Sequence, residues 1–273
     1  MSEDILKKII SKKYERLIIL KKKHPIESIK EHKSDGVPMY IDFRETIELN
    51  ISQNKISIIA EIKKASPSAG IIIENYNPVD IANIFYKNKA TCLSVLTEED
   101  FFLGSLNHIY KIKSKMIPVE KENMRIPILC KDFFIDPYQV HLAKYYGADA
   151  ILIILAAVTE DIANQIYEEA LNLNMSVIVE VHTKEEAKKS LNFTNALIGV
   201  NNRNLKTLKT DISTTFDIHD ILIDHKGPII SESGIQTAEQ IQEIKNKTKI
   251  RTFLIGESLL KNFNKNSILS LLK

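Results

Sequence analysis

Ala150-Ile-Leu-Ile-Ile-Leu155 and Ser176-Val-Ile-Val-Glu-Val181 are two short apolar runs, and the amphipathic segment Thr159–Leu173 lies between them. Near-continuous runs of Ile, Val and Leu are typical of strands that are buried on both faces of a parallel sheet. Two neighbouring parallel strands need a long crossover connection, which is usually an α-helix. The three segments therefore predict a β–α–β unit.

The same alternation of apolar runs and amphipathic segments extends in both directions along the chain. The predicted strands are Ser57–Ile62, Thr91–Leu96, Ile128–Lys131, Ala150–Leu155, Ser176–Val181, Ala196–Val200, Ile229–Glu232 and Thr252–Ile255. Helical patterns occupy Pro78–Lys89, Pro137–Tyr146, Thr159–Leu173, Lys184–Ser190 and Thr237–Asn246. Eight β–α units favour an α/β fold in the form of a single (β/α)₈ TIM barrel over an open doubly wound sheet. A GxGxxG loop, which would favour the doubly wound sheet, does not follow the first strand.

The residues before the first predicted strand have helical patterns of their own. We expect one helix over residues 1–23 and a second, short helix at Phe43–Asn50. The apolar stripe of the first helix consists of Ile5, Ile9, Ile10, Leu17 and Ile18. No Gly/Ser-rich linker follows, so we predict an N-terminal helical extension, residues 1–55, packed on a barrel domain of residues 56–273.

Composition narrows the class of protein. The 273-residue chain has the size of one barrel, and its net charge of +2 gives no electrostatic case for a nucleic-acid partner. Cys92 and Cys130 lie in apolar runs, so we expect buried free thiols and neither a disulfide framework nor a metal site. No apolar run is long enough to span a membrane, and the N-terminus lacks a signal-type apolar core. We therefore expect a cytoplasmic protein with no membrane partner.

Charged and amide side chains interrupt the predicted strands at their C-terminal ends, where barrels of this kind gather their active groups. Five of the eight strands end or continue in this way, at Glu61 and Lys63, Lys131, Glu180, Asn201 and Arg203, and Glu232. Any one of these residues could be a solvated strand end. Together, charges this close to a packed barrel must be paired or serve a ligand, which indicates acid–base chemistry on an anionic substrate.

Two glycine-containing turns indicate a phosphate site. Ser231-Glu-Ser-Gly-Ile235 and Leu254-Ile-Gly-Glu-Ser258 cover the ends of the last two predicted strands. In this fold the loops after strands seven and eight commonly bind phosphate through backbone N–H groups and a helix N-terminus. Either turn alone could be an ordinary glycine turn with a helix N-cap, but the two together in these places favour phosphate binding.

These stretches resemble the signature motifs of the indole-3-glycerol phosphate synthase family and occur in the family's order. The resemblance is carried by Ile59–Ser68, Ser94–Glu98, Cys130–Phe133, Glu180–His182, Gly199–Leu205, Ser231–Ile235 and Leu254–Leu259. The element Glu-x-Lys-x-x-Ser-Pro-Ser, residues 61–68, is the most diagnostic. The resemblance implies conversion of 1-(2-carboxyphenylamino)-1-deoxyribulose 5-phosphate into indole-3-glycerol phosphate, with release of CO₂ and water. This carboxy-lyase reaction of tryptophan biosynthesis needs no cofactor and no metal.

The resemblance also implies roles for the polar residues. Lys131 matches the general acid that protonates the ribulose carbonyl, and Glu180 matches the general base of the final step. Lys63 matches the lysine that holds the anthranilate carboxylate and assists dehydration. We expect nearby carboxylates to keep Lys131 charged while desolvation pulls its pKa down toward a useful value. The other matches are two partner carboxylates and a substrate-binding amide: Glu61, Glu232 and Asn201.

Further residues match the substrate contacts of the family. The phosphate contacts are Arg203, Ser233, Gly234, Gly256 and the backbone of Glu257, with Ser66 nearby. The pocket for the aromatic ring would be lined by Pro67, Phe102, Phe133, Leu152 and Leu205. For Leu152, plain core packing is an equally good interpretation. We expect His182 to orient the structure without ionising in catalysis.

A small phosphorylated substrate is the partner that the resemblance implies, and we expect a monomer that could associate loosely with other tryptophan-pathway enzymes. Another phosphate-binding barrel, such as phosphoribosylanthranilate isomerase or the tryptophan synthase α subunit, is the nearest alternative. Those enzymes would need a different acid–base pair and would lack Glu61-x-Lys63 together with Lys131. A non-catalytic barrel that binds a phosphometabolite is disfavoured by the presence of Lys131 and Glu180.

Overall fold

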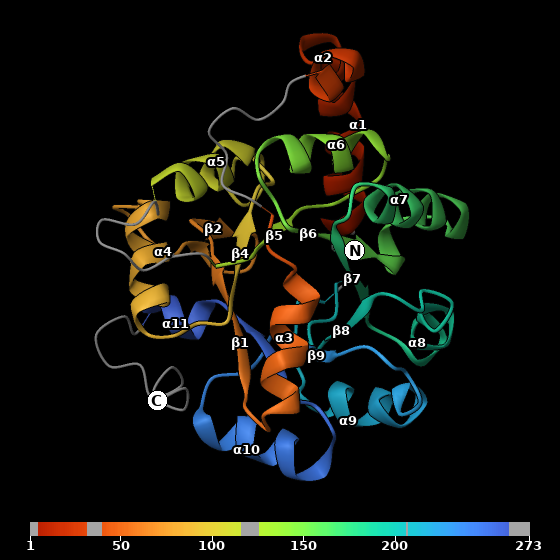
Figure 1. Ribbon diagram of the computed structural model, residues 1–273. Coiled ribbons are helices and arrows are strands. Elements are labelled where there is room, and N and C mark those ends of the chain that lie inside the picture. The colour runs from red at the N-terminus through yellow and green to blue at the C-terminus, as the bar shows by residue number, and fades with distance from the viewer. Residues whose placement is uncertain (1–4, 32–39, 116–125, 206, 262–273) are drawn as a thin grey trace.

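The computed structural model describes residues 5–31, 40–115, 126–205 and 207–261 (Figure 1). Eight parallel strands form a closed barrel in the order β1-β10-β9-β8-β7-β6-β5-β4. These strands are β1 (Ser57–Ile62), β4 (Cys92–Leu96), β5 (Ile128–Lys131), β6 (Ala150–Ile154), β7 (Ser176–Val181), β8 (Leu197–Asn201), β9 (Ile229–Glu232) and β10 (Thr252–Ile255). The predicted (β/α)₈ barrel is confirmed, and every predicted strand overlaps an observed one.

Helices surround the barrel on its outside (Figure 1). They are α4 (Pro78–Lys87), α5 (Leu106–Lys115), α6 (Tyr138–Tyr145), α7 (Glu160–Asn172), α8 (Lys184–Ser190), α9 (Ser213–His219), α10 (Ala238–Lys247) and α11 (Glu257–Lys261), with the short 3₁₀ turns η1 (Leu155–Ala157) and η2 (Asp220–Leu222). The helical patterns at Pro78–Lys89, Pro137–Tyr146, Thr159–Leu173, Lys184–Ser190 and Thr237–Asn246 correspond to α4, α6, α7, α8 and α10. A small antiparallel hairpin, β2 (Ala65–Ser66) with β3 (Gly70–Ile71), follows β1 and was not expected.

Along each strand, successive side chains point alternately into two hydrophobic cores, one between the barrel and the helices and one inside the barrel. On β1, Ile58 and Ile62 pack outward among the helices, whereas Ile59 packs inside the barrel with residues such as Leu129 and Ile178. This alternation follows from the period of two residues along a strand. It sends Glu61, two residues after Ile59, toward the barrel interior at the C-terminal end of β1.

The short helix α3 (Phe43–Ser52) covers the N-terminal end of the barrel and crosses in front of the strands in Figure 1. Phe43 and Ile47 are fully buried and join the inner core. The backbone N–H of Arg44 donates to Ser176 Oγ at 3.2 Å, and Asn50 Nδ2 donates to Ser57 Oγ at 3.2 Å. Because Ser57 and Ser176 begin their strands, α3 closes the bottom of the barrel.

The helix α1 (Ile5–Lys23) lies over the opposite, C-terminal end, and α2 (Ile26–Glu31) follows it. The expected apolar stripe of α1 is partly wrong. Its buried residues are Ile9, Lys13 and Leu17, whereas Ile18 is 60% exposed. Residues four apart share one helix face, so Lys13 lies between the two buried apolar residues and is buried with them. The division into an extension of residues 1–55 and a barrel of residues 56–273 remains a prediction.

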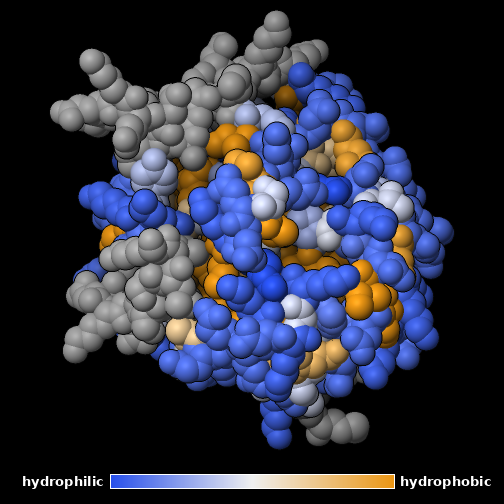
Figure 2. Space-filling view, turned by 60° about the horizontal axis from the view of Figure 1, so that its bottom comes forward, coloured by the Kyte–Doolittle hydropathy of each residue, from blue (hydrophilic) through white to orange (hydrophobic). Residues whose placement is uncertain are grey.

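The exterior is mainly polar on the face shown in Figure 2, where hydrophobic residues form separate small groups. Within the described ranges, no helix is both long enough and apolar enough to cross a lipid bilayer.

Replacing Ile47 by alanine tests the closure of the barrel by α3. We expect Ile47→Ala to lower the free energy of unfolding by about 2–5 kcal/mol, because the side chain is fully buried and leaves a cavity. Leu49, on the same helix, is 58% exposed, so Leu49→Ala should change the free energy of unfolding by less than about 0.5 kcal/mol. Urea unfolding followed by circular dichroism measures both. Equal effects of the two substitutions would contradict this packing.

Candidate active site

A cavity of about 700 Å³ opens at the C-terminal ends of the strands. Its lining contains every residue that the sequence singled out for catalysis or binding: Glu61, Lys63, Ser66, Pro67, Phe102, Lys131, Phe133, Leu152, Glu180, Asn201, Arg203, Leu205, Glu232, Ser233, Gly234, Gly256 and Glu257. The structure thus brings these residues together around one cavity. The role of each residue remains a prediction at this point.

Lys131, the last residue of β5, forms the centre of a buried ion cluster. Its Nζ lies 2.6 Å from Glu180 Oε2, at the end of β7, and 3.1 Å from Glu232 Oε2, at the end of β9. Burial lowers the pKa of Lys131, but the negative charges of Glu180, Glu232 and Glu61 outweigh burial, so the pKa is raised well above its usual value. The expectation that desolvation would pull this pKa down is therefore wrong, because two carboxylates contact the ammonium group and the negative charge of Glu61 adds to theirs.

The second lysine, Lys63, has its own carboxylate. Its Nζ lies 2.6 Å from Glu61 Oε1, and both side chains are largely buried. Glu61 fits there because residue 256 has no side chain: a Cβ on Gly256 would lie 2.5 Å from Glu61 Oε1. The glycine in the predicted phosphate turn after β10 therefore also makes room for a carboxylate of the site.

Glu232 differs from the other carboxylates. Burial, opposed by Lys131 and reinforced by the negative charge of Glu180, raises the pKa of Glu232 to about 7. Among the residues that the structure describes, none accepts or donates a hydrogen bond at its buried Oε1. Glu232 packs against Gly199 on β8, where a Cβ on residue 199 would collide with Glu232 Oε1. Buried polar atoms without a partner are rare, which sets Glu232 apart from the other carboxylates of the site.

Glu180 is held from three sides. Besides Lys131, its Oε1 accepts a hydrogen bond from Asn201 Nδ2 at 3.0 Å and lies 3.2 Å from His182 Nε2. Burial alone would raise the pKa of Glu180, but the positive charges of Lys131 and His182 lower it by more. The pKa of Glu180 therefore lies well below its usual value. Burial lowers the pKa of His182, yet Glu180 and Glu186 raise it to about 9. His182 is therefore cationic at neutral pH, which its position next to Glu180 in the sequence does not reveal.

The turns after β9 and β10 form one end of the cavity. Ser233 and Gly234 have φ angles of 64° and 75°, a left-handed pair that turns the chain sharply after Glu232. Asn202 Nδ2 donates to the carbonyl oxygen of Ser233 at 3.1 Å, and Ser258 Oγ donates to that of Ile235 at 2.9 Å. The first bond ties the turn after β9 to the end of β8, and the second joins the two turns to each other. Successive N–H groups in such turns, and a nearby guanidinium such as that of Arg203, can bind a phosphate.

The other end of the cavity is apolar. The rings of Phe102 and Phe133 are 6.2 Å apart between centroids, and Leu152 and Leu205 join the same core cluster. Three residues of α1 that the sequence did not single out also line this cavity: Ile5, Leu6 and Ile9. Their apolar spacing identified a helix, but nothing in the sequence indicated that this helix covers the site.

The arrangement suits an elongated substrate with an anionic end and a planar apolar end. Two ammonium groups lie between these ends, each within 2.6 Å of a carboxylate, so proton donors and acceptors are adjacent. Such pairs can move protons to and from a substrate held between them. Among the described residues, no group of three or more His, Cys, Asp or Glu side chains is placed to hold a metal ion.

Known proteins are similar to this chain in sequence or in fold. The chain matches the family model described as indole-3-glycerol phosphate synthase over residues 6–271. It is 37% identical over 272 residues to the indole-3-glycerol phosphate synthase of Trichodesmium erythraeum, which covers 98% of this chain and 88% of that protein. It is 39% identical over 271 residues to the tryptophan biosynthesis protein TrpCF of Buchnera aphidicola subsp. Acyrthosiphon pisum, covering 97% of this chain but 54% of that protein.

Among solved structures, a 3-hexulose-6-phosphate synthase covers 80% of this chain and 98% of its own, with a TM-score of 0.60. At 10% sequence identity this likeness concerns the barrel fold alone. The family model and the relative from Trichodesmium, in contrast, extend over nearly all of the sequence. The chain belongs to the indole-3-glycerol phosphate synthase family.

Proposed function

We propose that the cavity closes the indole ring of 1-(2-carboxyphenylamino)-1-deoxyribulose 5-phosphate, with Lys131 as the acid of the ring-closing step. Membership of the family makes the protein a carboxy-lyase of tryptophan biosynthesis. The observation that carries the assignment of Lys131 is its place between Glu180 and Glu232, in a cavity that apolar side chains and the turns after β9 and β10 also line.

The substrate lies across the cavity in this proposal. The turns at Ser233, Gly234 and Gly256, with Arg203, bind the phosphate group, and Lys63 binds the carboxylate on the aromatic ring. The ring itself lies between the apolar side chains: Pro67, Phe102, Phe133, Leu152 and Leu205. Anchoring both ends holds the ring carbon against the carbonyl carbon, which removes much of the entropic barrier to ring closure.

Bond formation and proton transfer then occur together. The ring carbon that bears the carboxylate attacks the ribulose carbonyl carbon, and the carbonyl oxygen takes a proton from Lys131. The positive charge that develops on the substrate nitrogen faces the carboxylates Glu61 and Glu232. The carboxylate group leaves as CO₂, and its bonding electrons neutralise the nitrogen.

Loss of water completes the aromatic ring. The new hydroxyl group leaves as water with a proton from Lys63, and Glu180 removes a proton from the resulting cation. Two separate acids suit a reaction with two protonation steps, since neither has to take up a new proton between the steps. Asn201 holds Glu180 in place through its 3.0 Å hydrogen bond.

The location and assembly of the protein belong to the same proposal. We propose that it works in the cytoplasm as a monomer, with a small phosphorylated substrate as its partner and with loose association to other enzymes of the pathway. The relative named TrpCF supports the last point, because this chain matches about half of that longer tryptophan biosynthesis protein.

Incubation with the carboxyphenylamino-deoxyribulose phosphate is the direct test. We expect indole fluorescence to rise with time and one CO₂ to be released for each indole formed. A well-folded protein that releases no indole product would overturn the proposed function.

Lys131→Met tests the acid. We expect kcat to fall by about 10²–10⁴-fold, the usual contribution of a positioned acid. Because the substitution leaves buried carboxylates without their cation, circular dichroism is used to verify that the variant is folded. Lys111→Met, at an exposed position on α5, is the matched control and should leave kcat unchanged. A Lys131→Met enzyme within about threefold of the wild-type rate, less than about 1 kcal/mol of barrier, would rule out this role.

Glu232 should control the pH dependence. Its pKa of about 7 means that the carboxylate is neutral below that pH and ionised above it, and only the ionised form stabilises the cationic intermediates. We expect kcat/KM to rise as the pH increases through about 7, and Glu232→Gln to abolish this rise. Glu239→Gln, at an exposed position on α10, should keep the wild-type profile. The same inflection in Glu232→Gln would assign it to another group.

A further inference from the structure

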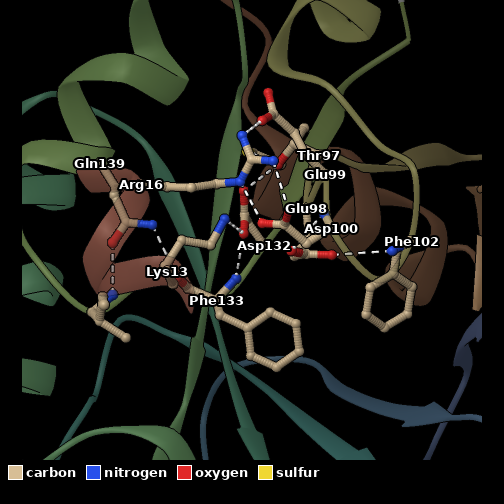
Figure 3. Close-up of polar contacts among 12 residues, drawn as sticks. Lys13, Arg16, Thr97, Glu98, Glu99, Asp100, Phe102, Asp132, Phe133 and Gln139 are labelled. Atoms are coloured by element: carbon tan, nitrogen blue, oxygen red, sulfur yellow. Dashed lines mark hydrogen bonds and ion pairs between the residues drawn. The ribbon is translucent and has the colours of Figure 1, made fainter. Parts of the chain in front are cut away.

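Lys13 of α1 is a buried cation outside the cavity, and it pairs with the residue that follows Lys131. Its Nζ lies 2.5 Å from Asp132 Oδ1, and both side chains are less than 10% exposed. Lys13 does not line the cavity, whereas Asp132 and Phe133 do. Figure 3 shows Lys13 reaching from α1 to Asp132, with the rings of Phe102 and Phe133 at the edge of the same polar cluster.

Asp132 connects the ends of two strands. Besides Lys13, its carboxylate accepts hydrogen bonds from Thr97 Oγ1 at 2.7 Å and from the backbone N–H of Phe133 at 2.7 Å. The backbone N–H of Thr97 donates to the carbonyl oxygen of Lys131 at 3.1 Å. The ends of β4 and β5, and with them the backbone of Lys131 and Phe133, are therefore tied to one buried carboxylate.

Glu98, the residue after Thr97, stabilises the loop that carries the ring of Phe102. Its buried carboxylate accepts the backbone N–H groups of Asp100, Phe101 and Phe102 at 3.0, 2.7 and 3.0 Å. The loop packs tightly, since a Cβ on Gly104 would lie 2.5 Å from the carbonyl oxygen of Leu96. Glu98 thereby fixes Phe102 opposite Phe133.

Two buried carboxylates thus position the two rings, and Lys13 is the buried cation that pairs with one of them, Asp132. Burial lowers the pKa of Lys13, but Asp132 and Glu98 raise it above its usual value, so the side chain stays charged. Without Lys13, Asp132 would be left as an unpaired buried charge, and it would have to take up a proton or move toward solvent. Either change would weaken the hydrogen bond of Asp132 to Thr97 or to Phe133.

We propose that Lys13 is a positioning residue of the enzyme, which holds the aromatic end of the cavity and the end of β5 in place through Asp132. This rests on the proposed function, in which Phe102 and Phe133 hold the aromatic ring of the substrate. Lys13 thereby acts on specificity from outside the cavity, and it acts on the aromatic end of the substrate only.

The test compares the two ends of the substrate in Lys13→Met. We expect kcat/KM to fall at least tenfold, mainly through a higher KM, and competitive inhibition by 2-aminobenzoate to weaken by a similar factor. Inhibition by inorganic phosphate should stay within twofold of the wild type, because its site lies at the turns after β9 and β10. Lys13→Arg, which keeps the charge, should restore kcat/KM to within about threefold of the wild type.

Arg16 provides the matched control, since it lies one turn further along α1 and also pairs with the loop after β4. It forms ion pairs with Glu99 and Asp100, but these are partly exposed and touch neither ring (Figure 3). We expect Arg16→Met to keep kcat/KM within twofold. If Lys13→Met does not fold, Lys13→Gln, which keeps an N–H donor for Asp132, takes its place.

The outcomes separate the two proposals. A wild-type protein that makes no indole product would refute the proposed function, whatever the variants do. If the wild type is active, the role of Lys13 is refuted when the folded variant without the charge, Lys13→Met or Lys13→Gln, keeps kcat/KM within twofold of the wild type. It is also refuted by parallel weakening of 2-aminobenzoate and phosphate inhibition, because a merely structural lysine would affect both ends equally.

Discussion

The buried ammonium group of Lys131 organises the C-terminal face of the barrel. Three carboxylates approach this point from β1, β7 and β9, and each is at most 6% exposed. Carboxylates buried so close together would be strongly destabilising without a cation among them. The cluster also needs space, and two glycines provide it: Gly199 beside Glu232 and Gly256 beside Glu61. A side chain at either position would displace a carboxylate, so this arrangement of charges requires glycine at both positions.

The barrel could be predicted almost completely from the sequence, because each strand carries its own signal. Five predicted strands, among them Ser57–Ile62 and Ser176–Val181, have the observed bounds, since each is a short, mainly apolar run between more polar segments. The hairpin of Ala65–Ser66 with Gly70–Ile71 was missed, because two-residue strands have no periodicity to detect. The burial of Lys13 could not be predicted either. The first helix contains several lysines, and only the position of Asp132 in the folded protein distinguishes Lys13 from the others.

The candidate site was predictable to the extent that it lies at strand ends. Parallel strands of a barrel bring their C-terminal residues to one rim, so residues such as Lys131 and Glu180, 49 positions apart, had to meet there. Contributions from elsewhere depend on packing between distant segments. The apolar residues of α1 over the cavity belong to this class, and so does the cationic state of His182, which results from two carboxylates that contact it.

The raised pKa of Lys131 constrains how the site can work. An ammonium group held by two carboxylates is a weak acid, so its proton becomes available only when those contacts loosen. Glu180 can loosen its contact at low cost, because Asn201 and His182 already hold its other oxygen. Glu232 lies farther from the ammonium group, at 3.1 Å, and its carboxylate is ionised above its pKa of about 7. Loosening of the Glu180 contact is therefore the smallest change that makes the proton of Lys131 available.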